Sequence, residues 1–283
     1  MAYRFNLFPG SPTIRDMFSK RAIRYQWRDN GPVITTAILL ICVAVWIVEL
    51  LLWLLWPSGL NELLGFGMFQ PMHAVSRPWT FITSMFLHQP TSLMHILFNM
   101  ISLWAVAPVL ERLMGHWPFL ALYLLSGIGG GLGMMAWGVI TPNGSGWLNA
   151  SYGASGALFG LFASLLIVYR RIGIDISSMM VWMVINFAMP FVMRNIAWQA
   201  HVGGFLIGAL FTWLLISGAH SLRGKSLTYR TAVYGAIVFV LLVVAVLLCD
   251  MGNPAEYSAC CSACRETDRK STRLNSSHEG RYR

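Results

Sequence analysis

Charged residues are scarce in this sequence. Asp, Glu, Lys and Arg make up only 11% of the 283 residues, and hydrophobic residues make up 56%. Soluble domains carry about 25% charged residues on average, so this composition argues against a soluble fold. Apolar runs of about 20 residues are long enough to cross a bilayer as helices, and the chain has several. The composition therefore indicates a polytopic membrane protein.

Two protease chemistries lack the residues that they need. The sequence has no His-Glu-x-x-His motif, and only His95 and His201 lie within apolar runs, which argues against a zinc protease. An aspartyl protease needs two buried Asp side chains, and no apolar run supplies such a pair. We therefore predict neither a metal nor any other cofactor.

Cysteine is also rare and unevenly placed. Cys42 lies in an apolar run and is expected to be inert packing. Cys260, Cys261 and Cys264 cluster in the polar tail, where only His278 could complete a zinc site that needs four ligands. Tail thiols or disulfides are the preferred interpretation.

The apolar pattern predicts an all-α membrane protein, a polytopic helical bundle. The long connection over 57–92 is rich in Phe, Trp, Leu and Met, so we expect it to pack on or dip into the membrane interface. We divide the chain into a basic segment (1–32), a core of six spans (33–217), a linker with a seventh span (218–249) and a polar, disordered tail (250–283). The seven predicted spans are Val33–Trp56, Leu93–Leu110, Trp117–Ile140, Tyr152–Tyr169, Ile176–Met193, Gln199–Ile216 and Ala232–Leu248.

The net charge of +9 is placed in the gaps between apolar runs. No basic stripe interleaved with aromatic residues occurs, so we predict no nucleic-acid partner. With the N-terminus inside, twelve Lys and Arg fall on inner segments and two, Arg77 and Arg194, on outer loops. This bias predicts a cytoplasmic N-terminus in a bacterial inner membrane, although the basic tail then lies outside, against the rule.

Few polar groups interrupt the spans, and each is a functional hypothesis because burial in lipid is costly. Ser155 lies in the fourth span and His201 in the sixth, each followed by glycines spaced four apart: Gly156 and Gly160, then Gly204 and Gly208. Such pairs let helices approach closely, so His201 could take the proton that makes Ser155 a nucleophile. The alternative is that the glycines only pack helices and the serine hydroxyl bonds its own backbone.

His95 and Asn99 are four residues apart and so share a helix face. Their side chains, with the backbone N–H of Ser155, could donate to the oxyanion of an acyl-transfer intermediate. A bundle-stabilising polar pair is the alternative, and Asn186 is interpreted as a helix–helix hydrogen bond. Because no well-placed carboxylate is available to orient His201, we expect a dyad.

Together these residues resemble the rhomboid family of intramembrane serine proteases over about residues 33–217. The matching motifs, each on its own span, are His95-x-x-x-Asn99, Gly153-Ala154-Ser155-Gly156 and Ala200-His201-x-x-Gly204-x-x-x-Gly208. Lesser similarities are Glu111-Arg112, Arg77-Pro78-Trp79 and Phe86-Leu87-His88.

The resemblance implies a six-helix core, with the seventh span as a known variant. It also implies Ser155 as nucleophile, His201 as base, and an oxyanion hole of Asn99, His95 and the Ser155 amide. Substrates would be single-span membrane proteins within the lipid bilayer, and the oligomeric state is open. One departure is Phe159, where many relatives have a Tyr that stacks on the catalytic His.

Two other functions stay open. A non-catalytic rhomboid-like protein that binds membrane clients usually lacks the Ser or the His, and both are present here. A proton-linked transporter using the two membrane histidines would be expected to show internal repeats, and none is evident.

Overall fold

The computed structural model describes residues 20–29, 31–177, 180–181, 183–185 and 197–254. This part of the chain is a bundle of helices without strands, with one isolated bridge between Phe69 and Ser151. Six of its helices are long and apolar enough to cross a membrane, and the chain is an integral, multi-pass membrane protein. They are α3 (Val33–Leu55), α6 (Leu93–Met114), α7 (His116–Ile140), α8 (Ser155–Ile172), α10 (Trp198–Ser217) and α11 (Leu227–Asp250).

These six helices confirm six of the seven predicted spans. The remaining one, Ile176–Met193, lies mostly outside the described residues, and so do Asn186, the tail cysteines and nearly all of the predicted tail. Cys42 is fully buried in the core, in keeping with its predicted packing role.

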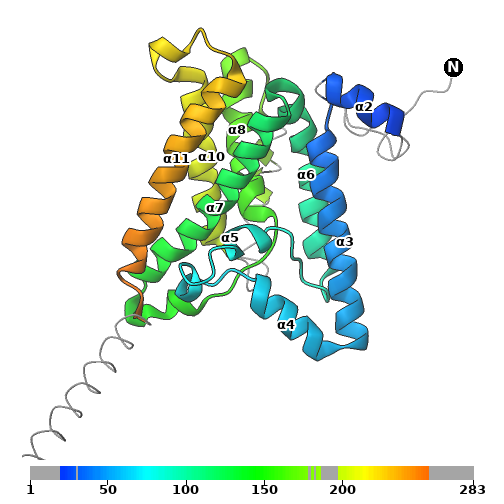
Figure 1. Ribbon diagram of the computed structural model, residues 1–283, viewed down its shortest axis with the longest axis vertical. Coiled ribbons are helices and arrows are strands. Elements are labelled where there is room, and N and C mark those ends of the chain that lie inside the picture. Colours follow the sequence, from blue (N-terminus) through cyan, green and yellow to red (C-terminus); the bar gives the residue numbers. More distant parts are fainter. Residues whose placement is uncertain (1–19, 30, 178–179, 182, 186–196, 255–283) are drawn as a thin grey trace, which may run out of the picture.

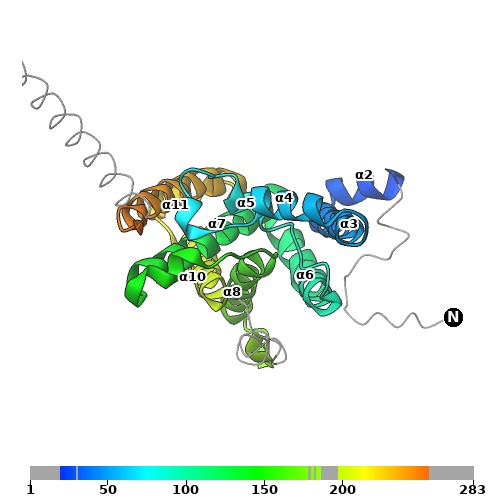
Figure 2. The same cartoon turned by 90° about the horizontal axis from the view of Figure 1, so that it is seen from below.

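Helix α7 forms the centre of the bundle, with α8 and α10 packed closely against it and α11 on its other flank (Figures 1 and 2). Helices α3 and α6 lie side by side at the opposite edge from α11. The peripheral helices α3 and α11 bury only about a fifth of the residues in their spans, whereas α7 and α8 bury about half. In a bilayer this exposure is favourable, because the surrounding lipid tails are as apolar as the side chains.

Several predicted helix boundaries were wrong. The fourth span begins at Ser155 and not at Tyr152, because Gly153 has φ +133°, which no helix allows. The second span continues to Met114, so Glu111 lies inside α6 and is fully buried. Helix α11 begins five residues before the predicted Ala232, where the Ser226 hydroxyl accepts from the N–H of Tyr229 and caps the helix.

The connection 57–92 is more regular than the predicted loop. It contains the helix α4 (Pro57–Gly67), the 3₁₀ turn η1 (Pro71–His73) and the short helix α5 (Thr80–Thr83). The end of α4 is held by two side chains from the segment between η1 and α5. The Arg77 guanidinium donates to the carbonyl of Gly65, and the Trp79 indole donates to that of Phe66. These bonds satisfy carbonyls that the end of a helix leaves without partners.

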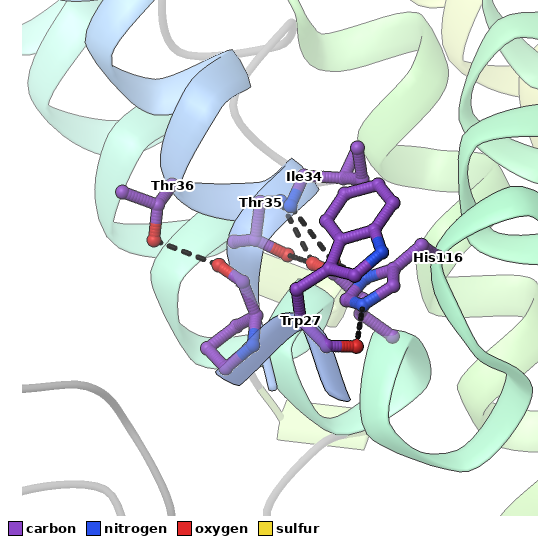
Figure 3. A network of polar contacts seen from close by, with 7 residues as sticks. Trp27, Ile34, Thr35, Thr36 and His116 are labelled. Atoms are coloured by element: carbon purple, nitrogen blue, oxygen red, sulfur yellow. Dashed lines mark hydrogen bonds and ion pairs between the residues drawn. The ribbon is translucent and has the colours of Figure 1, made fainter. Parts of the chain in front are cut away.

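A buried carboxylate joins α3 to α6 and α7 (Figure 3). Glu111 accepts from the backbone N–H groups of Ile34 and Thr35, both at 2.8 Å, and from the Thr35 hydroxyl at 2.7 Å. These N–H groups belong to the first turn of α3, which has no internal acceptors for them. His116 Nδ1 lies 2.6 Å from the same carboxylate, and its Nε2 lies 3.0 Å from the carbonyl of Trp27 in α2 (Lys20–Arg28), whose indole stacks on its ring.

Candidate active site

Ser155 and His201 meet in the interior of the bundle, from α8 and α10. The imidazole Nε2 of His201 lies 2.9 Å from Oγ of Ser155. His201 is buried, with 4% of its surface exposed, and Ser155 is half-buried. The two residues are 46 positions apart in the sequence, so only the packing of the two helices brings them together.

Glycines set the separation of those helices, as the sequence predicts. A Cβ on Gly204 would overlap the backbone carbonyl of Gly156, and one on Gly208 would overlap the backbone of Gly160. Such contacts exist only where both helices present small residues. Helix α7 contributes in the same way: a Cβ on Gly130 would lie 3.1 Å from the carbonyl oxygen of Ala200, the residue before His201.

The ring of His201 lies against Phe159. The two rings are stacked, with centroids 4.2 Å apart and planes inclined by 17°. Phe159 is one helical turn after Ser155 on α8 and is itself buried. An aromatic face therefore lies against the imidazole at this position and restricts the plane of the ring next to the serine.

The other ring nitrogen of His201 has a different environment. Nδ1 is buried and has no hydrogen-bond partner among the described residues. If Nε2 accepts the hydrogen bond from the serine hydroxyl, Nδ1 carries the ring hydrogen. The same part of the chain contains no group of three or more His, Cys, Asp or Glu side chains placed to hold a metal ion.

His95, from α6, approaches the serine from the side of Gly153. A Cβ on Gly153 would lie 2.9 Å from Nε2 of His95 and 3.9 Å from Oγ of Ser155. With its φ of +133° this position suits only glycine, and the missing side chain leaves the space between the two polar groups open. The N–H of Gly153 donates to the carbonyl of Ser84 at 2.8 Å, which holds this turn in place.

Asn99 and the backbone of Ser155 complete the predicted donor set. The Asn99 amide nitrogen donates to the carbonyl of His95 one turn earlier, at 2.8 Å, and keeps a second hydrogen for another acceptor. Ser155 is the first residue of α8, so its N–H has no partner within the helix and lies at the positive end of the helix dipole. The structure thus brings Ser155, His201 and Phe159 together and places His95 beside Gly153. Asn99 lies one turn after His95 on α6, and the roles of all these residues stay predictions.

A cavity of about 800 Å³ opens elsewhere, between α7, α11 and the segment around α5. Its lining is apolar, from Val75 and Phe81 at one side to Phe239 at the other. Neither Ser155 nor His201 lines it. The candidate chemistry is therefore separate from this cavity.

Two buried carboxylates were not foreseen as parts of the polar framework. Glu49 in α3 and Glu111 in α6 are both fully buried, and both accept hydrogen bonds from backbone N–H groups of other segments. The cost of an ionisable side chain inside a span was the signal that could have found them.

Comparison with known proteins finds a matching family and relatives that are named proteases. The Rhomboid domain family matches residues 75–218, about half of the chain. Rhomboid protease GluP of Bacillus subtilis is 31% identical over 185 residues, which cover 62% of this chain and 32% of GluP. YdcA of the same species is 37% identical over 145 residues, which cover 49% of this chain and 67% of YdcA.

A further relative comes from Emericella nidulans. Rhomboid-type serine protease 2 of Emericella nidulans is 30% identical over 183 residues, which cover 59% of this chain. The chain spans about a third of the length of GluP and of the fungal protease. The matched region contains α6, α7, α8 and α10, the helices that carry the candidate site. By its sequence and its helical architecture, the chain belongs to the rhomboid family.

Proposed function

We propose that this chain is an intramembrane serine endopeptidase that cleaves transmembrane segments of single-pass membrane proteins. The observation that carries the proposal is the 2.9 Å approach of His201 Nε2 to Ser155 Oγ between two glycine-packed membrane helices. A serine hydroxyl is a weak nucleophile until a positioned base removes its proton. We assign this activity to the unit formed by residues 33–217.

In the proposed reaction, His201 Nε2 takes the proton of Ser155 as Oγ attacks the scissile carbonyl carbon. The resulting oxyanion is stabilised by the N–H of Ser155 and by side-chain donors of His95 and Asn99, which must lie about 2.7–3.1 Å from it. The imidazolium then protonates the leaving amine, which leaves an acyl ester on Oγ. Water, deprotonated by the same histidine, hydrolyses the ester and regenerates the serine.

The placement of the serine supports entry of water from the side opposite α2. Ser155 follows the connection between α7 and α8, which lies at the end of the bundle away from α2 in Figure 1. Lys and Arg gather in α2, in the last turns of α6 and α8 (Arg112 and Arg170), and in the connection between α10 and α11 (Arg223). These helix ends lie at the same end of the bundle as α2 (Figure 1). By the positive-inside rule we assign that end, and with it the N-terminus, to the cytoplasm of a bacterial cell.

The test is cleavage of a model transmembrane substrate by the purified full chain in reconstituted vesicles. We expect Ser155→Ala and His201→Ala each to abolish cleavage, and Ser155→Ala to abolish labelling by a fluorophosphonate probe. Ser164→Ala, a change at another buried serine of α8, is the matched control and should leave both readouts unchanged. Cleavage by either dyad variant at the wild-type rate would refute the proposal.

The second candidate, a non-catalytic rhomboid-like protein that binds membrane clients, is less well supported. A chain selected only to bind would not need a serine hydroxyl and an imidazole within 2.9 Å of each other in a costly buried position. It predicts client capture that persists in Ser155→Ala without any cleavage product from the wild-type chain.

A further inference from the structure

Two side chains of α3 bind the backbone of the segment that leads into α6. The carboxylate Oε2 of Glu49 accepts from the N–H of His88 at 2.9 Å. The indole Nε1 of Trp46, one turn earlier on the same helix, donates to the carbonyl of Gln89 at 3.3 Å. Two consecutive loop residues are therefore attached to one face of α3, and Glu49 is fully buried where it makes this bond.

The next backbone group in this loop reaches the candidate site. The N–H of Gln89 donates to Nδ1 of His95 at 3.2 Å. A nitrogen that accepts a hydrogen bond cannot carry a hydrogen, so this contact selects the neutral tautomer in which Nε2 is protonated. Nε2 is the nitrogen that faces Gly153 and the neighbourhood of Ser155. The backbone of Gln89 thus decides which ring nitrogen can act as the donor.

We infer that Glu49 is a positioning residue for catalysis: by holding the backbone of 88–89 against α3, it keeps the Gln89 N–H on His95 Nδ1 and thereby presents His95 Nε2–H to the oxyanion. The inference rests on the proposed function, because it gives His95 a role in the same reaction. Glu49 acts through His95 and touches neither the serine nor the base.

The bonds from Trp46 and Glu49 to residues 88–89 explain why the apolar helix α3 contains a carboxylate. All three bonds involve a backbone group of His88 or Gln89, and lipid offers no substitute partner for a freed N–H. His88 itself uses Nδ1 to contact the carbonyl of Phe86 at 3.2 Å, which further stiffens the turn. A hydrophobic residue at position 49 would leave the His88 N–H without its acceptor and release the loop.

The predicted consequences separate positioning from mere stability. Glu49→Gln retains a side-chain oxygen that can accept the His88 N–H, so we expect cleavage within about threefold of wild type. Glu49→Leu removes the acceptor, and we expect kcat to fall about 10- to 100-fold, in the range of losses for oxyanion donors, with KM nearly unchanged. The rate of fluorophosphonate labelling of Ser155 should fall in parallel, because phosphonylation develops the same negative charge.

A double-mutant cycle with His95→Ala is the decisive measurement. If Glu49 acts through His95, then adding Glu49→Leu to the His95→Ala variant should lower kcat by less than about twofold. Thermal unfolding is followed for every variant, and rates are measured well below the lowest transition. The inference would be overturned if the fold-losses in kcat of the two single variants multiply in the double variant. It would also be overturned if folded Glu49→Leu keeps the wild-type kcat.

Indole variants provide a matched control on the same helix. Trp46→Phe loses the bond to the Gln89 carbonyl and should lower kcat several-fold, whereas Trp53→Phe alters an exposed indole of α3 and should not. Equal losses in both would also overturn the inference. Failure of the proposed function would give a different result. Ser155→Ala would then still cleave the substrate, or His95→Ala alone would leave kcat unchanged.

Discussion

Replacing Gly204 by alanine tests whether helix packing sets the geometry of the dyad. A Cβ at this position would overlap the carbonyl oxygen of Gly156 and lie 2.7 Å from the carbonyl carbon. Both are backbone atoms of α8, which cannot rotate away as a side chain can. The methyl group can therefore be accommodated only if α8 and α10 move apart.

The structure gives the scale of the effect. The Oγ–Nε2 distance of 2.9 Å lies within the range of about 2.6–3.2 Å that proton transfer requires. A separation of roughly 1 Å between the helices takes the pair out of this range, and misplacement by about 1 Å can cost about 100-fold in rate. Overpacking of this kind costs about 1–3 kcal/mol of stability, so the variant should still fold.

The assay measures kcat for a transmembrane substrate in vesicles, together with the rate of fluorophosphonate labelling. Gly235→Ala in α11 is the matched control, because its added methyl would meet only Phe211 at 3.9 Å. We expect Gly204→Ala to lose about 100-fold in both rates and the control to lose none. Wild-type rates in folded Gly204→Ala would refute the claim that these glycines hold the dyad together.

Three further changes test other contacts. Phe159→Leu removes the ring that stacks on the imidazole and should lower kcat up to about tenfold, since such pairs contribute about 0.5–1.5 kcal/mol, whereas Phe159→Tyr should retain activity. Glu111→Leu leaves the first turn of α3 without its buried acceptor and should lower the free energy of unfolding by about 3–5 kcal/mol, measured by thermal or denaturant unfolding. The exposed Glu62→Ala is the control and should leave the free energy of unfolding unchanged. Asn253→Ala removes the bond from the segment after α11 to the carbonyl of Met72 and should lower the free energy of unfolding by about 1 kcal/mol. An unchanged free energy of unfolding would mean that this bond contributes no net stability.

Much of the fold follows from the apolar pattern alone. Six spans could be placed because lipid requires about 20 consecutive apolar residues, and that requirement leaves a clear trace in the sequence. The approach of α8 to α10 could also be predicted, because glycines spaced four apart on two helices have few other uses in a membrane. The same reasoning put His201 next to Ser155.

The local geometry of the site was harder to predict. The apolar pattern begins at Tyr152, so hydropathy alone starts the fourth helix three residues before its true start at Ser155. What ends it is the backbone of Gly153, and its φ of +133° cannot be read from composition. This error matters chemically, because a serine in mid-helix would have its N–H bonded within the helix, whereas the first residue keeps it available.

The two buried carboxylates show a more general reason why some contacts could not be predicted from the sequence. Glu49 and Glu111 were visible as ionisable residues in or beside apolar runs, but their partners are backbone N–H groups of distant segments, which carry no residue identity. Turns and helix starts always leave such groups unsatisfied, and lipid cannot hydrogen-bond to them. A carboxylate on a neighbouring helix can accept several of them at once, as Glu111 does for the first turn of α3. A buried acid in a membrane helix therefore indicates, in the first place, a neighbouring stretch of backbone that needs an acceptor, and in Glu49 that stretch is the one leading to His95.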